Sequence, residues 1–192
     1  MKVVIANDHA GVELKRDLIP RLRAAGFGVL DLGTSTTRPA DYPDSAEAAA
    51  QALVAGRADR GILICGSAVG VSVAACKFPG IRAAVCHDSY SARQGVEHDA
   101  MNILCLGARI IGPELAWELV RNFLAARFSG EARHVRRLAK IAAIEASVSG
   151  APGTDRPRRS PRSAGRRSRT SVSGPSGEGA GPAGRWHRRS RD

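Results

Sequence analysis

The sequence is poor in cysteine, and its cysteines are not arranged in pairs. Four occur in 192 residues, each within or near an apolar run: Cys65, Cys76, Cys86 and Cys105. The close spacing of a zinc site is missing, and so is the dense pattern of a small disulfide-bonded domain. We therefore expect no metal, no disulfide and a reduced, cytoplasmic setting.

Long apolar runs are missing as well. Charged residues arrive early, at Asp8, Glu13 and Lys15, so the sequence predicts no secretory leader. No window approaches the apolar length that spans a bilayer, and we expect no membrane partner. A chain of this length normally forms one domain with room for an appendage.

The net charge of +11 is unevenly distributed. Residues 1–148 hold 18 Lys and Arg against 15 Asp and Glu, whereas residues 149–192 hold 11 against 3. The second stretch is rich in Ser, Arg, Pro and Gly and has almost no branched apolar residues, so it cannot offset its own ordering entropy. We predict a disordered basic tail at 149–192. Trp186 is its only aromatic residue, so any nucleic-acid binding should be weak and non-specific.

Short apolar runs alternate with helical periodicity through residues 1–148. Strands are predicted at 2–6, 28–32, 61–65, 81–86 and 103–106. Helices are predicted at 11–25, with a kink at Pro20, and at 44–55, 69–77, 89–96, 113–127 and 131–146. This alternation predicts an α/β domain over 1–148: a Rossmann-like three-layer α/β/α sandwich around a five-stranded parallel sheet of order 2-1-3-4-5.

The third predicted strand delivers Cys65 into a loop of small residues that opens a helix. Backbone N–H groups from Gly66 to Gly70 can turn inward there and form an anion hole. The helix N-terminus would favour both a thiolate and a bound anion. The plainer alternative is that Cys65 is a small buried apolar residue.

The first and third strands flank the expected switch point, where open sheets of this kind bind ligands. Asp8 and His9 follow the first strand, while Cys65 and Ser67 follow the third. Each has a structural alternative, since Asp8 and Ser67 can cap helices and His9 can be a turn residue. Their convergence at one crevice favours a function.

Several further motifs occur in order along the domain. Together with the Cys65 loop they are Asp8-His9-Ala10-Gly11, Asp41-Tyr42-Pro43, Gly80-Ile81-Arg82-Ala83, Tyr90-Ser91-Ala92-Arg93, Glu97-His98, Leu106-Gly107-Ala108-Arg109, and Arg133-His134 with Arg137. This series resembles the type B ribose-5-phosphate isomerase family, which includes the galactose-6-phosphate isomerase subunits. The resemblance runs from Lys2 to about Glu145.

The resemblance implies a cofactor-independent aldose–ketose isomerase that converts ribose 5-phosphate to ribulose 5-phosphate, in the pentose phosphate pathway, through a cis-enediolate. Cys65 would be the proton-transfer base, and His98 would open the sugar ring. Asp8 would orient sugar hydroxyls. The loop from Gly66 to Gly70, with Ser67 where the family usually has threonine, would stabilise the enediolate oxygen.

The resemblance also implies a phosphate-binding set and an assembly. The set comprises His9, Arg109, Arg133, His134 and Arg137, of which the guanidinium groups suit phosphate oxygens. Family members act as dimers whose sites take residues from both subunits. We therefore expect a homodimer, or a dimer of dimers, with shared active sites.

Three residues depart from the family pattern near the expected site. Ala68 replaces a glycine, which costs about 1 kcal/mol if that position has a positive φ. Asp99, beside His98 in the substrate-binding set, places a carboxylate where asparagine is usual. Cys76 also stands where asparagine is usual. These changes concern substrate choice and rate more than the fold.

Two kinds of alternative function stay open. The substrate could be another phosphorylated sugar, such as a four-carbon tetrulose phosphate or allose or galactose 6-phosphate. The protein could also be a non-catalytic relative that binds a sugar phosphate, which Ala68 and Asp99 favour. A dinucleotide enzyme ranks lower, because no Gly-x-Gly-x-x-Gly follows the first strand.

Removal of residues 150–192 should leave folding and oligomeric state unchanged, and isomerase kinetics within about twofold, because a disordered tail adds few native contacts. Any salt-sensitive affinity for RNA should disappear with the tail. Steady-state kinetics and RNA titrations of the full and shortened chains test this. Loss of turnover on truncation would show that the tail reaches the site.

Overall fold

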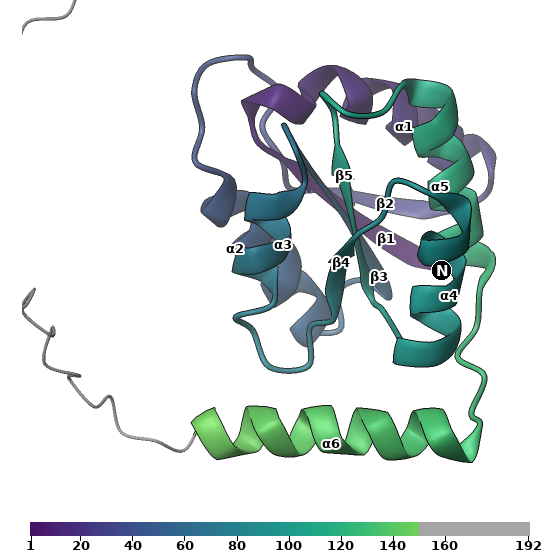
Figure 1. Ribbon diagram of the computed structural model, residues 1–192. Coiled ribbons are helices and arrows are strands. Elements are labelled where there is room, and N and C mark those ends of the chain that lie inside the picture. The colour runs from purple at the N-terminus through teal and green to yellow at the C-terminus, as the bar shows by residue number, and fades with distance from the viewer. Residues whose placement is uncertain (150–192) are drawn as a thin grey trace, which may run out of the picture. The chain divides into compact units, whose positions relative to one another are not determined.

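Five strands form one parallel sheet in the computed structural model, which describes residues 1–149 (Figure 1). The strands are β1 (Lys2–Asn7), β2 (Gly28–Asp31), β3 (Arg60–Cys65), β4 (Ala83–Val85) and β5 (Ile103–Gly107). The predicted tail, apart from its first residue, lies outside the described residues. The predicted three-layer α/β class with five parallel strands is confirmed.

The strand order is β2-β1-β3-β5-β4, so the predicted order 2-1-3-4-5 is wrong in its last two strands. β5 is buried along its whole length, whereas β4 is three residues long and partly exposed. A continuous apolar strand gains most between two neighbours, and a short, half-exposed one suits the edge. The reversal between β1 and β3, which defines the ligand-binding edge, is as predicted.

Helices cover both faces of the sheet (Figure 1). α1 (Val12–Ala24), α4 (Ser89–Asp99) and α5 (Pro113–Ala125) lie on one face, with a short 3-10 turn, η1 (His9–Gly11), before α1. α2 (Tyr42–Val54) and α3 (Val69–Ala75) lie on the other. α1 is one continuous helix through Pro20. The predicted helices are all present, with boundaries that differ by a few residues.

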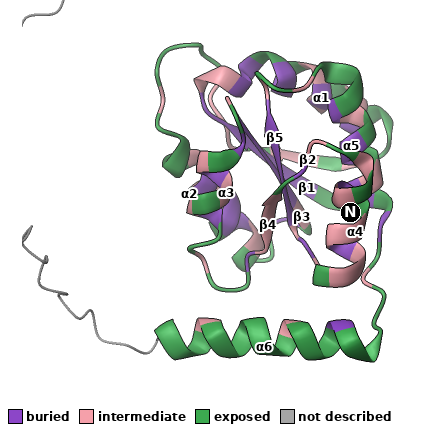
Figure 2. Ribbon diagram, viewed as in Figure 1, coloured by how far each residue is buried: buried purple, intermediate pink, exposed green. Residues whose placement is uncertain are grey.

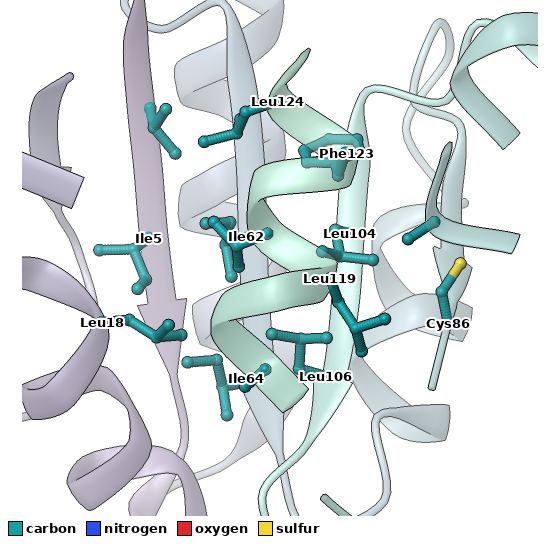
Figure 3. Close-up of a cluster of buried hydrophobic side chains, with 14 of the residues drawn as sticks. Ile5, Leu18, Ile62, Ile64, Cys86, Leu104, Leu106, Leu119, Phe123 and Leu124 are labelled. Atoms are coloured by element: carbon teal, nitrogen blue, oxygen red, sulfur yellow. The ribbon is translucent and has the colours of Figure 1, made fainter. Parts of the chain in front are cut away.

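The two faces of β3 show the alternation of a strand buried on both sides. Ile62 and Ile64 pack beneath α1 and α5 in the cluster that Figure 3 shows, with Leu119 and Phe123 of α5. Leu63 and Cys65 face α2 and α3. Cys65 is therefore held by a strand with no freedom to slip, because a one-residue shift would exchange the two faces.

Small side chains bring α2 close to the sheet. Ala46, Ala49 and Ala50 have no exposed surface, and they pack against Val4 and Leu63. An alanine face lets helix and sheet backbones approach closely. This contact fixes the N-terminal end of α2, where Tyr42 lies.

α6 (Ala132–Ser149) differs from the other helices in its exposure (Figure 2). Its apolar residues Val135, Ile141 and Ile144 are 49%, 39% and 63% exposed. His134 is its only buried residue among positions 132–148. No helix within residues 1–149 combines the length and apolar character needed to cross a membrane.

Candidate active site

A cavity of about 340 Å³ opens where β1 and β3 end. Its lining comes from four places in the chain, namely the end of β1, the start of α2, the β3–α3 loop and the loop after β5. The lining residues are Asp8, Tyr42, Cys65, Gly66, Ser67, Gly70, Arg109 and Ile110. The predicted ligand-binding position at the carboxyl ends of β1 and β3 thus has a thiol (Cys65), a carboxylate (Asp8) and a guanidinium (Arg109) around one cavity.

Cys65 is the last residue of β3 and is only 5% exposed. Its carbonyl accepts a hydrogen bond from the N–H of Ala108 at 2.9 Å, and that of Gly66 accepts one from Arg109 at 3.0 Å. These bonds continue the β3–β5 ladder into the loop after β5. They fix the position of the Arg109 backbone relative to Cys65.

The other thiols differ from Cys65 in their surroundings. Burial raises the pKa of Cys86 to about 11, and burial holds the pKa of Cys105 well above its usual value. Both therefore remain protonated at neutral pH and are poor bases. Cys76 is exposed and its Sγ lies 3.3 Å from the carbonyl oxygen of Ala83, away from the cavity lining.

The β3–α3 loop has one residue in the left-handed region. Ala68 has a φ of 70° and a ψ of −16°, and it is fully buried. This is the conformation that favours glycine, so the alanine is strained as the sequence analysis anticipated. At Gly70 a Cβ would lie 2.8 Å from the Tyr42 ring, so this glycine is what lets the ring reach the cavity.

Asp8 and His9 follow β1 but take different positions. Asp8 lines the cavity, is 7% exposed, and accepts a hydrogen bond at Oδ1 from the N–H of Ala10 at 2.9 Å. It therefore caps the following turn while one carboxylate edge faces the cavity. His9 is outside the lining, and its Nδ1 lies 3.2 Å from the N–H of Ala40.

His98 and His134 form a second group of predicted site residues. Their rings stack with centroids 4.1 Å apart. Nδ1 of His98 lies 2.7 Å from Nε2 of Gln94, and Nδ1 of His134 lies 2.8 Å from the hydroxyl of Ser129. Burial, His98 and Arg133 lower the pKa of His134, and its Nε2 has no hydrogen-bond partner among residues 1–149. In the described part of the chain, one buried ring nitrogen of His134 thus has no partner.

Three charged residues accompany this pair. Arg133 and Arg137 lie exposed on α6, and Asp99 is the exposed last residue of α4. Arg133 donates to Glu131 from Nε at 2.8 Å. Arg133 and Arg137 are one helical turn apart and so share a face of α6.

The two groups lie at opposite ends of the strands within one chain. Cys65 pairs with Gly107 at the carboxyl end of β5, whereas α4 ends four residues before Ile103, at the other end of that strand. Four steps along a strand span about 13 Å. The structure therefore brings together Asp8, Cys65, Gly66, Ser67, Gly70 and Arg109, and it places His98, Asp99, Arg133, His134 and Arg137 elsewhere.

Two lining residues were given no role in the sequence analysis. Tyr42 belongs to the motif Asp41-Tyr42-Pro43, and this motif is the feature of the sequence from which a place in the site could have been predicted. Ile110 follows Arg109 and carries no chemical group that marks it in a sequence.

Among the described residues no group of three His, Cys, Asp or Glu side chains is placed to hold a metal ion.

Comparison with known proteins identifies the family of this chain. Residues 3–141 match the family model described as Ribose/Galactose Isomerase. Ribose-5-phosphate isomerase B of Escherichia coli is 43% identical over 140 residues, which is 73% of this chain and 93% of that protein. D-erythrulose-4-phosphate isomerase of Pectobacterium atrosepticum is 40% identical over 131 residues, or 68% and 86% of the two chains.

A solved structure shows the same fold. Ribose-5-phosphate isomerase B of Clostridium thermocellum superposes with a TM-score of 0.75 at 47% identity, covering 77% of this chain and 99% of that one. The fold is therefore the parallel α/β sandwich of a sugar-phosphate isomerase. The chain belongs to the ribose/galactose isomerase family.

Replacement of Ala68 by glycine should change the free energy of unfolding by less than about 1 kcal/mol. Relief of left-handed strain is worth about 1–2 kcal/mol, and it offsets the lost methyl burial and the added chain entropy, each about 0.5–1 kcal/mol. The matched control is Ala75→Gly in α3, which is equally buried but helical and should lose about 1–2 kcal/mol. Urea denaturation of both variants at one protein concentration measures the difference. Equal losses would contradict strain at Ala68.

Proposed function

We propose that this protein interconverts ribose 5-phosphate and ribulose 5-phosphate, a reaction of the pentose phosphate pathway, in the cytoplasm. The observation that carries the proposal is the placement of the Cys65 thiol, the Gly66–Gly70 loop and Arg109 around one cavity, in a chain of the ribose/galactose isomerase family. Four free cysteines agree with a reduced compartment.

Cys65 serves as the base that moves the proton. As thiolate it takes the proton from C2 of the open-chain aldose, and the electrons of that bond shift to the C1 oxygen, which gives the cis-enediolate. The same proton then returns to C1, while the proton of the C2 hydroxyl passes to the C1 oxygen and C2 becomes a carbonyl. C1 is reduced and C2 is oxidised, so no cofactor is needed.

The loop after Cys65 stabilises the charge that develops on oxygen. Gly66, Ser67 and Gly70 line the same cavity as the thiol, so their backbone N–H groups and the Ser67 hydroxyl are the donors available to the substrate oxygen. Donors that are fixed before the reaction lower its barrier because they need no reorganisation. Asp8 orients the sugar hydroxyls, and Arg109 attracts the phosphate.

A phosphorylated sugar of another length is the second candidate. The specific observation in its favour is the 40% identity to an isomerase named for D-erythrulose 4-phosphate. Ala68, Asp99 and Cys76 depart from the family pattern, and Ser67 stands where threonine is usual. Of these, Ser67, Ala68 and Asp99 are the residues that would set the preference.

We also propose that two chains share each active site. His98 is assigned to ring opening, and Arg133, His134 and Arg137 to the phosphate. In one chain, however, His98 lies at the opposite end of the strands from Cys65, with His134 beside it. In a two-fold dimer, the end of the sheet that carries Cys65 in one protomer would lie against the end that carries His98 in its partner. The exposed apolar residues of α6 supply a surface for that contact.

Cys65→Ala should lower kcat by about 10²–10⁴ while the protein stays folded, the range expected for loss of a general base. The assay is turnover of ribose 5-phosphate, with four- and six-carbon sugar phosphates measured beside it. Cys76→Ala is the control, since that thiol lies outside the cavity lining. If Cys65→Ala retains parental turnover on the best substrate, the base is another group.

A mixing experiment tests the shared site. Cys65→Ala and His98→Ala should each be nearly inactive alone. When equal amounts are unfolded and refolded together, half of the dimers are mixed, and each contains one intact site, so about a quarter of the parental activity should return. Sedimentation of the mixture confirms dimers. Mixed dimers with no recovered activity would mean that each chain carries a whole site.

A further inference from the structure

His87 occupies a position just past the end of the edge strand β4. The main-chain ladder between β4 and β5 reaches Cys86, whose N–H lies 3.4 Å from the carbonyl of Cys105. Every second residue of β5 directs its backbone N–H and C=O toward β4. After Cys105, the next backbone donor on that side of β5 is therefore the N–H of Gly107. It donates to Nε2 of His87 at 3.0 Å. A side chain thus accepts the hydrogen bond at the point where the edge strand stops.

Gly107 is the root of the loop that carries Arg109. Its carbonyl accepts hydrogen bonds from Ile110 at 2.9 Å and from Ile111 at 3.1 Å, which close the turn. On the opposite side, Ala108 and Arg109 are bonded to the carbonyls of Cys65 and Gly66. The loop is therefore fixed by β3 on one side and by His87 on the other.

The fit around Gly107 leaves little room for movement. A Cβ at this position would lie 2.8 Å from Ile110, 3.0 Å from Nε2 of His87 and 3.1 Å from the carbonyl carbon of Ser67. Ser67 and Ile110 line the candidate site, while His87 does not. His87 therefore lies outside the cavity. It contacts the loop that carries Arg109 and does not contact a ligand in the cavity.

We propose that His87 is a positioning residue, which fixes the Arg109 loop against the Cys65 loop through the N–H of Gly107 and thereby strengthens binding of the substrate phosphate. The inference rests on the proposed sugar-phosphate isomerase function. Nε2 must be unprotonated to accept this hydrogen bond, so the bound tautomer carries its proton on Nδ1.

Two substitutions separate the hydrogen bond from the volume of the side chain. His87→Gln keeps an acceptor oxygen at a similar reach, whereas His87→Leu keeps bulk without an acceptor. His87→Leu should raise KM for ribose 5-phosphate by about threefold to tenfold, the effect of one lost neutral hydrogen bond, with kcat within about twofold. His87→Gln should stay within about twofold of the parent in both constants. Parental KM in His87→Leu, or equal losses in both variants, would overturn the proposal.

Amide hydrogen exchange gives a measurement that does not depend on turnover. Peptides covering residues 107–109 should exchange about tenfold faster in His87→Leu than in the parent, and His87→Gln should restore protection. Unchanged exchange in His87→Leu would show that His87 does not hold the loop. If the parent shows no turnover of any sugar phosphate, the isomerase function fails, while the exchange result still decides the role of His87.

Discussion

The double pairing of β3 is the constraint on which the site depends. β3 is hydrogen-bonded to β1 along one edge and to β5 along the other, and Gly61 to Cys65 are buried. Its register places Asn7 beside Ile64 and Gly107 beside Cys65. Asp8 and Arg109 are therefore brought to the thiol by backbone geometry, without any direct bond between their side chains and sulfur.

Much of this arrangement follows from residue patterns. Alternating apolar runs and helical stretches predict the strands, the helices and the parallel sheet, because burial on both faces requires that composition. The order of the last two strands does not follow from periodicity, which describes one element at a time. The strand predicted at 81–86 is longer than the one predicted at 103–106, whereas in the structure β4 is limited to Ala83–Val85 and is partly exposed, so only packing reveals which strand takes the edge.

The candidate site shows the same division. The small-residue loop after Cys65 and the acid after β1 can be read from the sequence, since their positions follow from strand ends. The separation of His98 from Cys65 follows from chain order too, because α4 ends just before β5 begins and therefore lies at the opposite end of the strands. The position of Arg137 does not, because it depends on where α6 packs. His87 gives no signal in the sequence either. Its role depends on where β4 stops, and a difference of one residue there would assign its hydrogen bond to the backbone.

The alanine face of α2 connects core packing to the width of the site. Ala46, Ala49 and Ala50 set the distance between α2 and the sheet, and Tyr42 at the start of that helix packs over Gly70 at the cavity. A larger side chain on this face would displace the helix and carry the Tyr42 ring with it. A substitution at these buried positions would consequently change the size of the molecule that the cavity admits, as well as the stability of the core.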